Sequence, residues 1–156
     1  MKIITTLCAT LGLLLSLQTP AFASDKGTPA EAEAMVEKTL AALREHGKED
    51  TYAKVSDPND TEFHDRDLYV FIITLDGKGT FVAHGAKPVL IGRDLIDLKD
   101  TKGSPLVRNF VKMVEDHGEG WVDYVWPNPI TKKNEEKSSF VKKFDDDVFV
   151  GVGIYK

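Results

Sequence analysis

Cysteine is almost absent from this sequence. Its one cysteine, Cys8, lies in the apolar run close to the amino terminus. The remainder of the chain therefore has no disulfide and no cysteine-based metal site, and a hydrophobic core must hold it together. Enzyme motifs are also lacking: there is no Gly-x-Ser-x-Gly elbow, no phosphate-binding glycine loop and no His-Glu-x-x-His. We predict a protein that is not an enzyme and that carries no metal or cofactor.

Basic residues are also fewer than acidic ones in this sequence. The chain has 20 lysines and arginines against 25 aspartates and glutamates, for a net charge of −5, and no basic block. This excludes nucleic acid and anionic membrane surfaces as expected partners. The four histidines are scattered without metal-ligand spacing. The acidic run Asp145-Asp146-Asp147 is interpreted as a solvated turn rather than a Ca²⁺ site.

Long apolar runs are missing everywhere except at the start of the chain. Lys2 precedes an apolar stretch at residues 7–17, and Ala21-Phe22-Ala23 places small residues where a signal peptidase cuts. We predict a signal peptide at residues 1–23 and one periplasmic domain at residues 24–156 that is not an integral membrane protein. An uncleaved membrane anchor is the alternative, although the run is short for a span of roughly 20 residues.

Three helices are expected. Thr28-Pro29-Ala30-Glu31 has a capping threonine, a proline at the first helical position and a glutamate three residues after the cap, and apolar residues then repeat at helical spacing until Gly47. A short second helix with Tyr52 and Val55 follows. Ser104-Pro105 begins a third helix, which Gly118 ends.

Five stretches have the composition of β-strands, at residues 68–75, 80–84, 120–126, 137–144 and 148–155. Their connections are short, apart from the helix at 105–117, so the strands should pair antiparallel. Residues 85–103 form a long loop, which in a compact domain usually has a functional or ligand-covering role. We predict an α+β domain with one antiparallel sheet of about five strands and a helix packed across it.

A candidate binding site follows from strand alternation. Tyr124 and Trp126 share a face of one strand, and Lys137 begins the next strand along the chain. A lysine beside a phenol and an aromatic wall can receive a carboxylate, although composition alone favours an ordinary exposed lysine at a strand end. His84 ends its strand and is a further candidate for the pocket or for a purely structural role.

The glycines of the last strand bear on the same site. Gly151 and Gly153 share a face with Phe149 and Tyr155 and leave a trough bounded by aromatic rings. The trough either makes room for a small ligand or allows a helix backbone to pack closely. Arg93, in the long loop, is another candidate cation, or an ordinary partner of Asp94.

Several short stretches together resemble a known family, the single Cache domain of type 2. In chain order they are Asp67-Leu68-Tyr69-Val70-Phe71, Leu75-Asp76-Gly77, Val82-Ala83-His84, Gly92-Arg93-Asp94, Asp97-Leu98-Lys99-Asp100, Gly118-Glu119-Gly120-Trp121-Val122-Asp123-Tyr124, Trp126-Pro127-Asn128-Pro129, Lys137-Ser138-Ser139-Phe140-Val141 and Gly151-Val152-Gly153-Ile154-Tyr155. Each stretch alone is weakly specific, but the ordered set covers nearly all of residues 24–156.

The resemblance implies a PAS-like antiparallel sheet with a long N-terminal helix, and an extracytoplasmic sensor of small molecules, often short carboxylates. By motif position it implies ligand contacts at Tyr124 and Lys137, with His84 and Trp126 lining the pocket. The family often has tyrosine where this chain has Phe140, and proline where it has Glu136 just before Lys137. We therefore expect one ligand hydrogen bond to be lost at Phe140.

The leading hypothesis is a periplasmic sensor that binds a small organic anion and passes its signal to a separate partner, such as a membrane histidine kinase or chemoreceptor. One alternative is a small periplasmic enzyme in which His84 and an acid form a general acid–base pair. Another is an accessory subunit of a membrane kinase or chemoreceptor whose pocket takes no ligand. The sequence does not distinguish the ligand, the partner or the oligomeric state.

The predicted processing gives a first test. We expect the exported protein to begin at Ser24, because Ala21-Phe22-Ala23 closes the apolar run with small residues. The intact mass of the protein from a periplasmic extract measures the cut directly. Recovery of the full chain, with residues 1–23, from the membrane fraction would instead establish an anchored protein.

Overall fold

The fold is described by a computed structural model in which residues 26–156 are placed. The predicted signal peptide at residues 1–23, its cleavage point and Cys8 lie outside these described residues. Within residues 26–156, no helix combines the length and the apolar character required to cross a bilayer.

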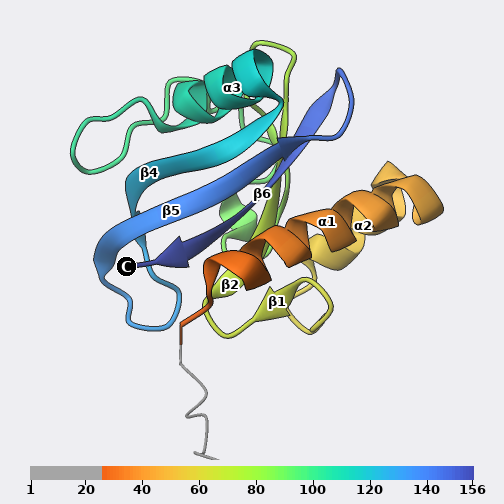
Figure 1. Cartoon of the computed structure of the whole chain (residues 1–156), viewed down its shortest axis with the longest axis horizontal. Coiled ribbons are helices and arrows are strands. Elements are labelled where there is room, and N and C mark those ends of the chain that lie inside the picture. Colours follow the sequence, from red (N-terminus) through yellow and green to blue (C-terminus); the bar gives the residue numbers. More distant parts are fainter. Residues whose placement is uncertain (1–25) are drawn as a thin grey trace, which may run out of the picture.

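One antiparallel sheet organises the molecule (Figure 1). Its strand order is β1-β2-β6-β5-β4, and the short β3 pairs with β2 on the side away from β6. The longest continuous pairing joins β4 to β5 as a hairpin from Glu119↔Lys142 to Pro127↔Asn134. The strands are β1 (His64–Asp65), β2 (Leu68–Thr74), β3 (Phe81–His84), β4 (Glu119–Pro127), β5 (Asn134–Lys143) and β6 (Val148–Tyr155).

The helices form where the sequence predicts them. The capping box of α1 (Pro29–His46) is complete, since Thr28 and Glu31 each bond the other's backbone N–H. The short α2 (Lys48–Ser56) follows Gly47, whose φ of 83° breaks the helix. The third helix, α3 (Leu106–His117), ends at Gly118.

The acidic run before β6 has a partner on α2. Lys48 Nζ lies 2.9 Å from a carboxylate oxygen of Asp145 and 2.8 Å from one of Asp147. The run is therefore a turn, as predicted, and it is tied to the second helix by a lysine.

Each face of the sheet has its own core, and α1 and α3 lie on opposite sides (Figure 1). The α1-side core is mainly aliphatic and includes Val36, Leu40, Val70 and Val152. The α3-side core is rich in rings; it contains Tyr69, Phe71, Phe81, Phe110, Tyr124, Trp126, Phe149 and Tyr155. Alternation along β2 produces this division, because Leu68, Val70 and Ile72 face α1 while Tyr69, Phe71 and Ile73 face α3.

The predicted α+β class with a single antiparallel sheet is confirmed, with two differences in detail. The sheet has six strands, because β1 adds a two-residue pairing to the beginning of β2. Strand β5 begins at Asn134, three residues earlier than predicted, because residues 134–136 continue the hairpin with the end of β4. Polar side chains at an exposed strand end carry little of the alternating pattern on which the prediction relied.

The glycine trough on β6 is filled by side chains of the protein itself. A Cβ atom at Gly151 would overlap the ring of Phe71, and one at Gly153 would overlap Lys137 Cε and Ser139 Oγ. The nearest atoms are neither a helix backbone nor open space, so neither of the two alternatives describes the trough. The missing side chains make room for Phe71 and for the stem of Lys137.

A Gly151→Ala substitution tests how rigid this packing is. We expect it to lower the free energy of unfolding by about 1–3 kcal/mol, because a buried ring must move to admit the methyl group. Urea denaturation of the purified domain measures the change. Gly120→Ala is the matched control: its methyl group would meet the flexible side chain of Met113, so it should cost less. Equal losses in the two variants would contradict tight packing over Gly151.

Candidate ligand-binding site

A completely buried lysine lies at the centre of the α3-side face. Strand register places Lys137 of β5 between Tyr124 of β4 and Tyr155 of β6. Its stem crosses Gly153, and its Nζ lies 3.7 Å from the centre of the Tyr69 ring and 4.6 Å from that of Tyr155. The amino group therefore lies against two aromatic faces, which stabilise its protonated form through cation–π contacts.

The Lys137 amino group has no hydrogen-bond acceptor among the described residues. Its side chain is 0% exposed. Burial lowers the pKa of Lys137 well below its ordinary value, the charge of Lys87 lowers it further, and the charge of Asp67 opposes the shift. A buried amine with free donors favours an anion as its binding partner, because an anion supplies both acceptors and charge.

Three tyrosines add hydroxyl groups beside the lysine. The Tyr124 hydroxyl lies 2.9 Å from Ser139 Oγ. Tyr155 donates to the carbonyl of Pro127 at 2.9 Å, and its oxygen lies 3.2 Å from the Tyr69 hydroxyl. Burial raises the pKa of all three phenols, so they remain neutral hydrogen-bonding groups at physiological pH.

His84 is buried among aromatic rings and is held in one orientation. Its Nδ1 accepts hydrogen bonds from the backbone N–H groups of Ala86 and Lys87, at 3.1 and 3.0 Å, which leaves the ring proton on Nε2. The ring stacks on Tyr69 with centroids 5.2 Å apart. Burial, together with the charges of Lys137 and Lys87, lowers the pKa of His84 to about 3, so the imidazole is neutral at physiological pH.

The rings enclose a small cavity of about 10 Å³. That is room for roughly one water molecule. Trp126 meets Tyr124 edge to face at 6.1 Å, and Lys87 Nζ lies 4.6 Å from the centre of the Trp126 ring. The cavity is lined by Tyr69, Phe71, Phe81, His84, Leu106, Phe110, Tyr124 and Trp126.

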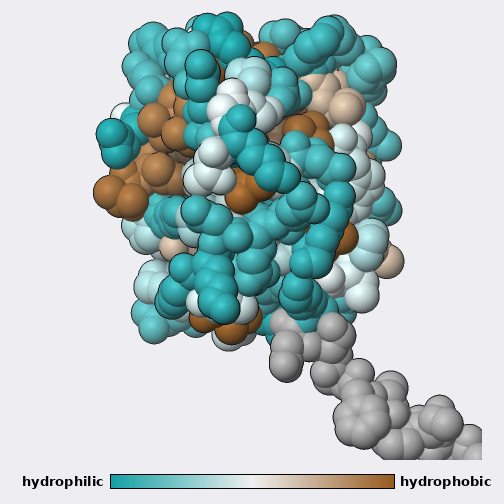
Figure 2. All heavy atoms as spheres, turned by 90° about the vertical axis from the view of Figure 1, so that its left-hand side faces the viewer, coloured by the Kyte–Doolittle hydropathy of each residue, from teal (hydrophilic) through white to brown (hydrophobic). Residues whose placement is uncertain are grey.

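The long loop, residues 85–103, packs on the α3-side core that contains this cavity. Residues 85–103 include a turn of 3-10 helix, η1 (Pro88–Leu90), and several apolar side chains that pack on the α3-side core; these are Ala86, Leu90, Leu95, Ile96 and Leu98. Val89 of the same turn is 72% exposed. Figure 2 shows a mostly hydrophilic surface with apolar groups gathered towards one margin. The sequence-based expectation of a covering loop agrees with this packing.

A larger groove of about 230 Å³ lies along the β4–β5 hairpin, and Tyr124 and Lys137 are among the residues that line it. Its charged walls already have partners: Lys102 pairs with Glu136 at 2.8 Å and Lys156 with Asp123 at 2.9 Å. By strand alternation Asp123 and Glu136 point to the face opposite Lys137. We therefore assign the candidate site to the Lys137 side of β4 and β5, where Tyr124 lines both the groove and the aromatic cavity.

The structure brings the four predicted site residues together. Tyr124, Lys137, His84 and Trp126 all lie on the α3-side face, and Tyr124 is directly opposite Lys137 in register. Ligand contact by these residues remains a prediction. Arg93 is exposed on the covering loop and is not part of the cavity.

The expectation for Phe140 is wrong. This ring lies in the α1-side core, 5.6 Å from the ring of Trp121, on the face opposite Lys137. A hydroxyl at this position would point towards α1 and not into the aromatic cavity, because neighbouring residues of β5 alternate between faces. Phenylalanine in place of tyrosine at this position therefore affects the packing of α1 on the sheet and not the aromatic cavity.

Three further residues lie around the lysine. Strand alternation placed Tyr155 on this face, whereas Tyr69 and Asp67 entered the sequence analysis only as part of the first stretch that resembles the family. Asp67 was given no role there, because it precedes β2 and the period of the strand does not describe its surroundings. It is nevertheless 1% exposed and acts on the pKa of Lys137.

Comparison with known proteins begins with three solved structures. A methyl-accepting chemotaxis protein from Vibrio parahaemolyticus superposes with a TM-score of 0.67 and 22% identity, covering 81% of this chain and 86% of that one. A structure described as the basis for carboxylic acid recognition by a Cache chemosensory domain gives 0.63 and 22%, with coverage of 81% and 86%. A periplasmic sensor domain of a chemotaxis protein gives 0.60 and 28%, with coverage of 81% and 88%. These similarities establish the fold.

Among curated proteins, methyl-accepting chemotaxis protein McpP of Pseudomonas putida is 29% identical over 93 residues. The match covers 59% of this chain but only 17% of that protein, so it concerns one part of a much longer receptor. The family whose sequence profile matches is Single Cache domain 2, over residues 13–156. This match spans most of the sequence and agrees with the fold and with the aromatic face around Lys137, so the chain belongs to the single Cache domain 2 family.

Proposed function

We propose that this domain senses a short organic anion by binding its carboxylate between Lys137 and Tyr124, with Trp126 against the apolar part. The observation that carries the proposal is the buried amino group of Lys137, which has free donors and no acceptor. An unpaired polar group in such a position destabilises the folded protein by about 1–3 kcal/mol. A carboxylate relieves that cost, because it restores acceptors and opposite charge together.

The relatives support a sensory role. Cache domains are extracytoplasmic sensor domains, and the proteins similar to this chain include parts of chemotaxis receptors, one described by its recognition of carboxylic acids. We extend these properties to the present chain as part of the proposal. It includes export by the signal peptide at residues 1–23 and a chemoreceptor or membrane kinase as the protein that receives the signal.

Binding requires some movement of the residues around the cavity. A space of about 10 Å³ is too small for a carboxylic acid of several atoms. The stem of Lys137 lies against the Cα of Gly153, and we infer that it turns aside when a ligand enters. The covering loop at residues 85–103 can also shift, since it lies on the rings through partly exposed side chains. A ligand thus has two ways to make room for itself.

The structure favours this role over an enzyme based on His84. A general base works best with a pKa near the operating pH, whereas the His84 pKa is lowered to about 3 and its Nδ1 already accepts two backbone hydrogen bonds. The neutral ring instead serves as a rigid wall with an N–H donor. A sensor needs a group of this kind, because it must bind its ligand without altering it.

Lys137→Met is the direct test of the proposed site. We expect two effects in opposite directions: the free protein should gain about 1–3 kcal/mol, because an unpaired buried amine is replaced by an apolar chain of similar length, and carboxylate binding should be lost. Thermal unfolding with and without acetate, propionate and lactate measures both effects. A bound carboxylate raises the melting temperature by mass action on the folded state.

The matched control is Lys112→Met, the same substitution on an exposed face of α3, where the side chain is 76% accessible. It should leave the thermal shift with carboxylates unchanged. If Lys137→Met keeps that shift, the carboxylate is bound elsewhere. If the unsubstituted protein responds to no carboxylate, the accessory-subunit hypothesis takes the place of the sensor.

A second prediction concerns the pH dependence of carboxylate binding. Burial lowers the pKa of Lys137 in the free protein, and a bound carboxylate should raise it again towards the ordinary value of about 10.4. Between these two pKa values binding takes up a proton, so affinity should fall as the pH rises through that interval. Calorimetric titration in phosphate and in Tris, whose ionisation enthalpies differ, measures the uptake. Identical binding enthalpies in both buffers across the interval would contradict a shifted lysine.

A further inference from the structure

We propose that Asp67 is a second polar anchor of the site, and that the preferred ligand carries a hydrogen-bond donor next to its carboxylate, as 2-hydroxy acids and 2-amino acids do. The proposal rests on the carboxylate site at Lys137 and adds the class of ligand. It also adds a specificity-determining residue on the loop that precedes β2.

Two buried side-chain atoms among residues 26–156 have no hydrogen-bond partner, and they are Lys137 Nζ and Asp67 Oδ2. The two residues are 0% and 1% exposed. They form no direct ion pair. Asp67 precedes Tyr69 by two residues, and Lys137 Nζ lies 3.7 Å from the centre of the Tyr69 ring. The charge of Asp67 also raises the pKa of both Lys137 and Tyr155, which agrees with a position near the site. The buried surroundings of Tyr69 thus contain an unsatisfied donor and an unsatisfied acceptor.

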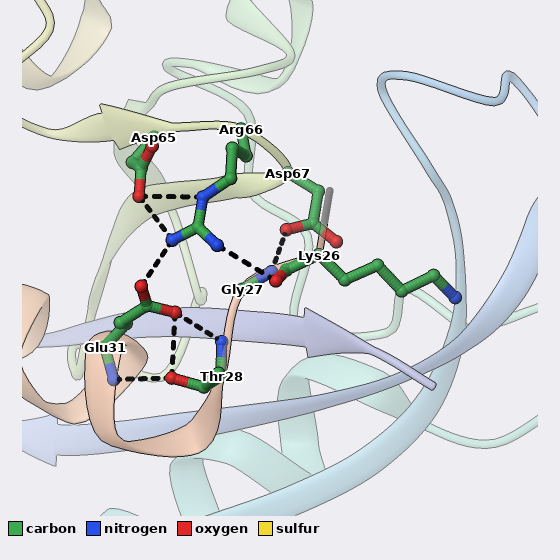
Figure 3. Close-up of polar contacts among 7 residues, drawn as sticks. All are labelled: Lys26, Gly27, Thr28, Glu31, Asp65, Arg66 and Asp67. Atoms are coloured by element: carbon green, nitrogen blue, oxygen red, sulfur yellow. Dashed lines mark hydrogen bonds and ion pairs between the residues drawn. The ribbon is translucent and has the colours of Figure 1, made fainter. Parts of the chain in front are cut away.

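The orientation of Asp67 is fixed by the start of the first helix. Its Oδ1 accepts a hydrogen bond of 2.6 Å from the backbone N–H of Gly27 (Figure 3). The adjacent Arg66 is directed elsewhere, to Glu31 at 2.5 Å and Asp65 at 2.6 Å. Figure 3 shows Asp67 Oδ2 on the side away from the Arg66 guanidinium. One oxygen is therefore used to hold the residue in place, and the other remains as an acceptor.

The chemistry of the two atoms selects the ligand. Lys137 offers donors to an anion, whereas Asp67 offers a charged acceptor and repels a second negative group. A molecule that satisfies both must have a carboxylate at one end and an O–H or N–H donor close by. A simple fatty acid would leave Oδ2 unpaired, and a 2-oxo acid would place a carbonyl oxygen against a carboxylate.

Four three-carbon acids test this with the skeleton held constant: propionate, pyruvate, L-lactate and L-alanine. We expect L-lactate or L-alanine to bind roughly ten- to a hundred-fold more tightly than propionate, the usual value of one hydrogen bond to a charged group, and pyruvate to bind most weakly. Calorimetric titration of the mature domain gives the four dissociation constants.

Asp67→Asn then changes one atom of the site. The amide oxygen can still accept from Gly27, while the new NH₂ group becomes a donor in the position of Oδ2. We expect the ratio of lactate affinity to pyruvate affinity to fall at least ten-fold, and the variant to bind pyruvate more tightly than the unsubstituted protein does. The ratio is the readout because removing a negative charge strengthens the binding of every anion. Asp65→Asn, two residues earlier at the end of β1 and with its side chain 51% exposed, is the matched control and should leave the ratio unchanged.

The outcomes separate this inference from the proposed function. If all four acids bind with similar constants and Lys137→Met abolishes binding, the carboxylate site stands and the role of Asp67 is refuted. The same conclusion follows if Asp67→Asn leaves the ratio unchanged. If none of the four acids binds, both proposals fall. Because the ranking of the ligands is measured on the unsubstituted protein, the test remains decisive even if Asp67→Asn fails to fold.

Discussion

Burial of Lys137 is the constraint on which the α3-side face of this domain depends. An amino group can lie inside a protein only with aromatic faces, acceptors or a nearby negative charge to offset desolvation. Here Tyr69 and Tyr155 supply the faces, Asp67 supplies the charge, and Gly153 leaves space for the stem. These residues come from β2, β6 and the loop before β2, and the lysine itself from β5, so the sheet must be complete before the lysine is accommodated.

The two faces of the sheet differ in composition: the α1-side core is suited to holding the fold together, and the α3-side core to binding a ligand. The α1-side core is mainly aliphatic and holds the long helix, and Phe140 belongs to it. The α3-side core contains most of the rings together with the buried hydroxyl groups and His84, which gives it hydrogen-bonding groups within an apolar surround. Ligand sites commonly have this composition. The unpaired polar atoms lower the stability of the domain, and the apolar packing of the α1-side core offsets that loss.

The site is also close to the ends of the described chain. Asp67 bonds the N–H of Gly27, immediately before α1, and Lys26 Nζ donates to the carbonyl of Lys156 at 2.9 Å. The carboxyl-terminal end of β6 therefore lies beside the start of α1 (Figure 1). Asp67, whose charge acts on the pKa of Lys137, thus bonds the residue that precedes the cap of α1.

The sequence by itself determined the elements and the residues that were needed for a first hypothesis. The capping box at Thr28, the period of two in the strands and the short connections depend on local chemistry, so they predicted α1, the antiparallel sheet and the grouping of Tyr124, Trp126 and Lys137. Local patterns fail where an atom's surroundings come from distant segments. The position of Lys137 over Gly153, the side of the sheet to which Phe140 belongs and the burial of Asp67 were decided only by the tertiary structure, because each depends on strand register and on which helix covers which face.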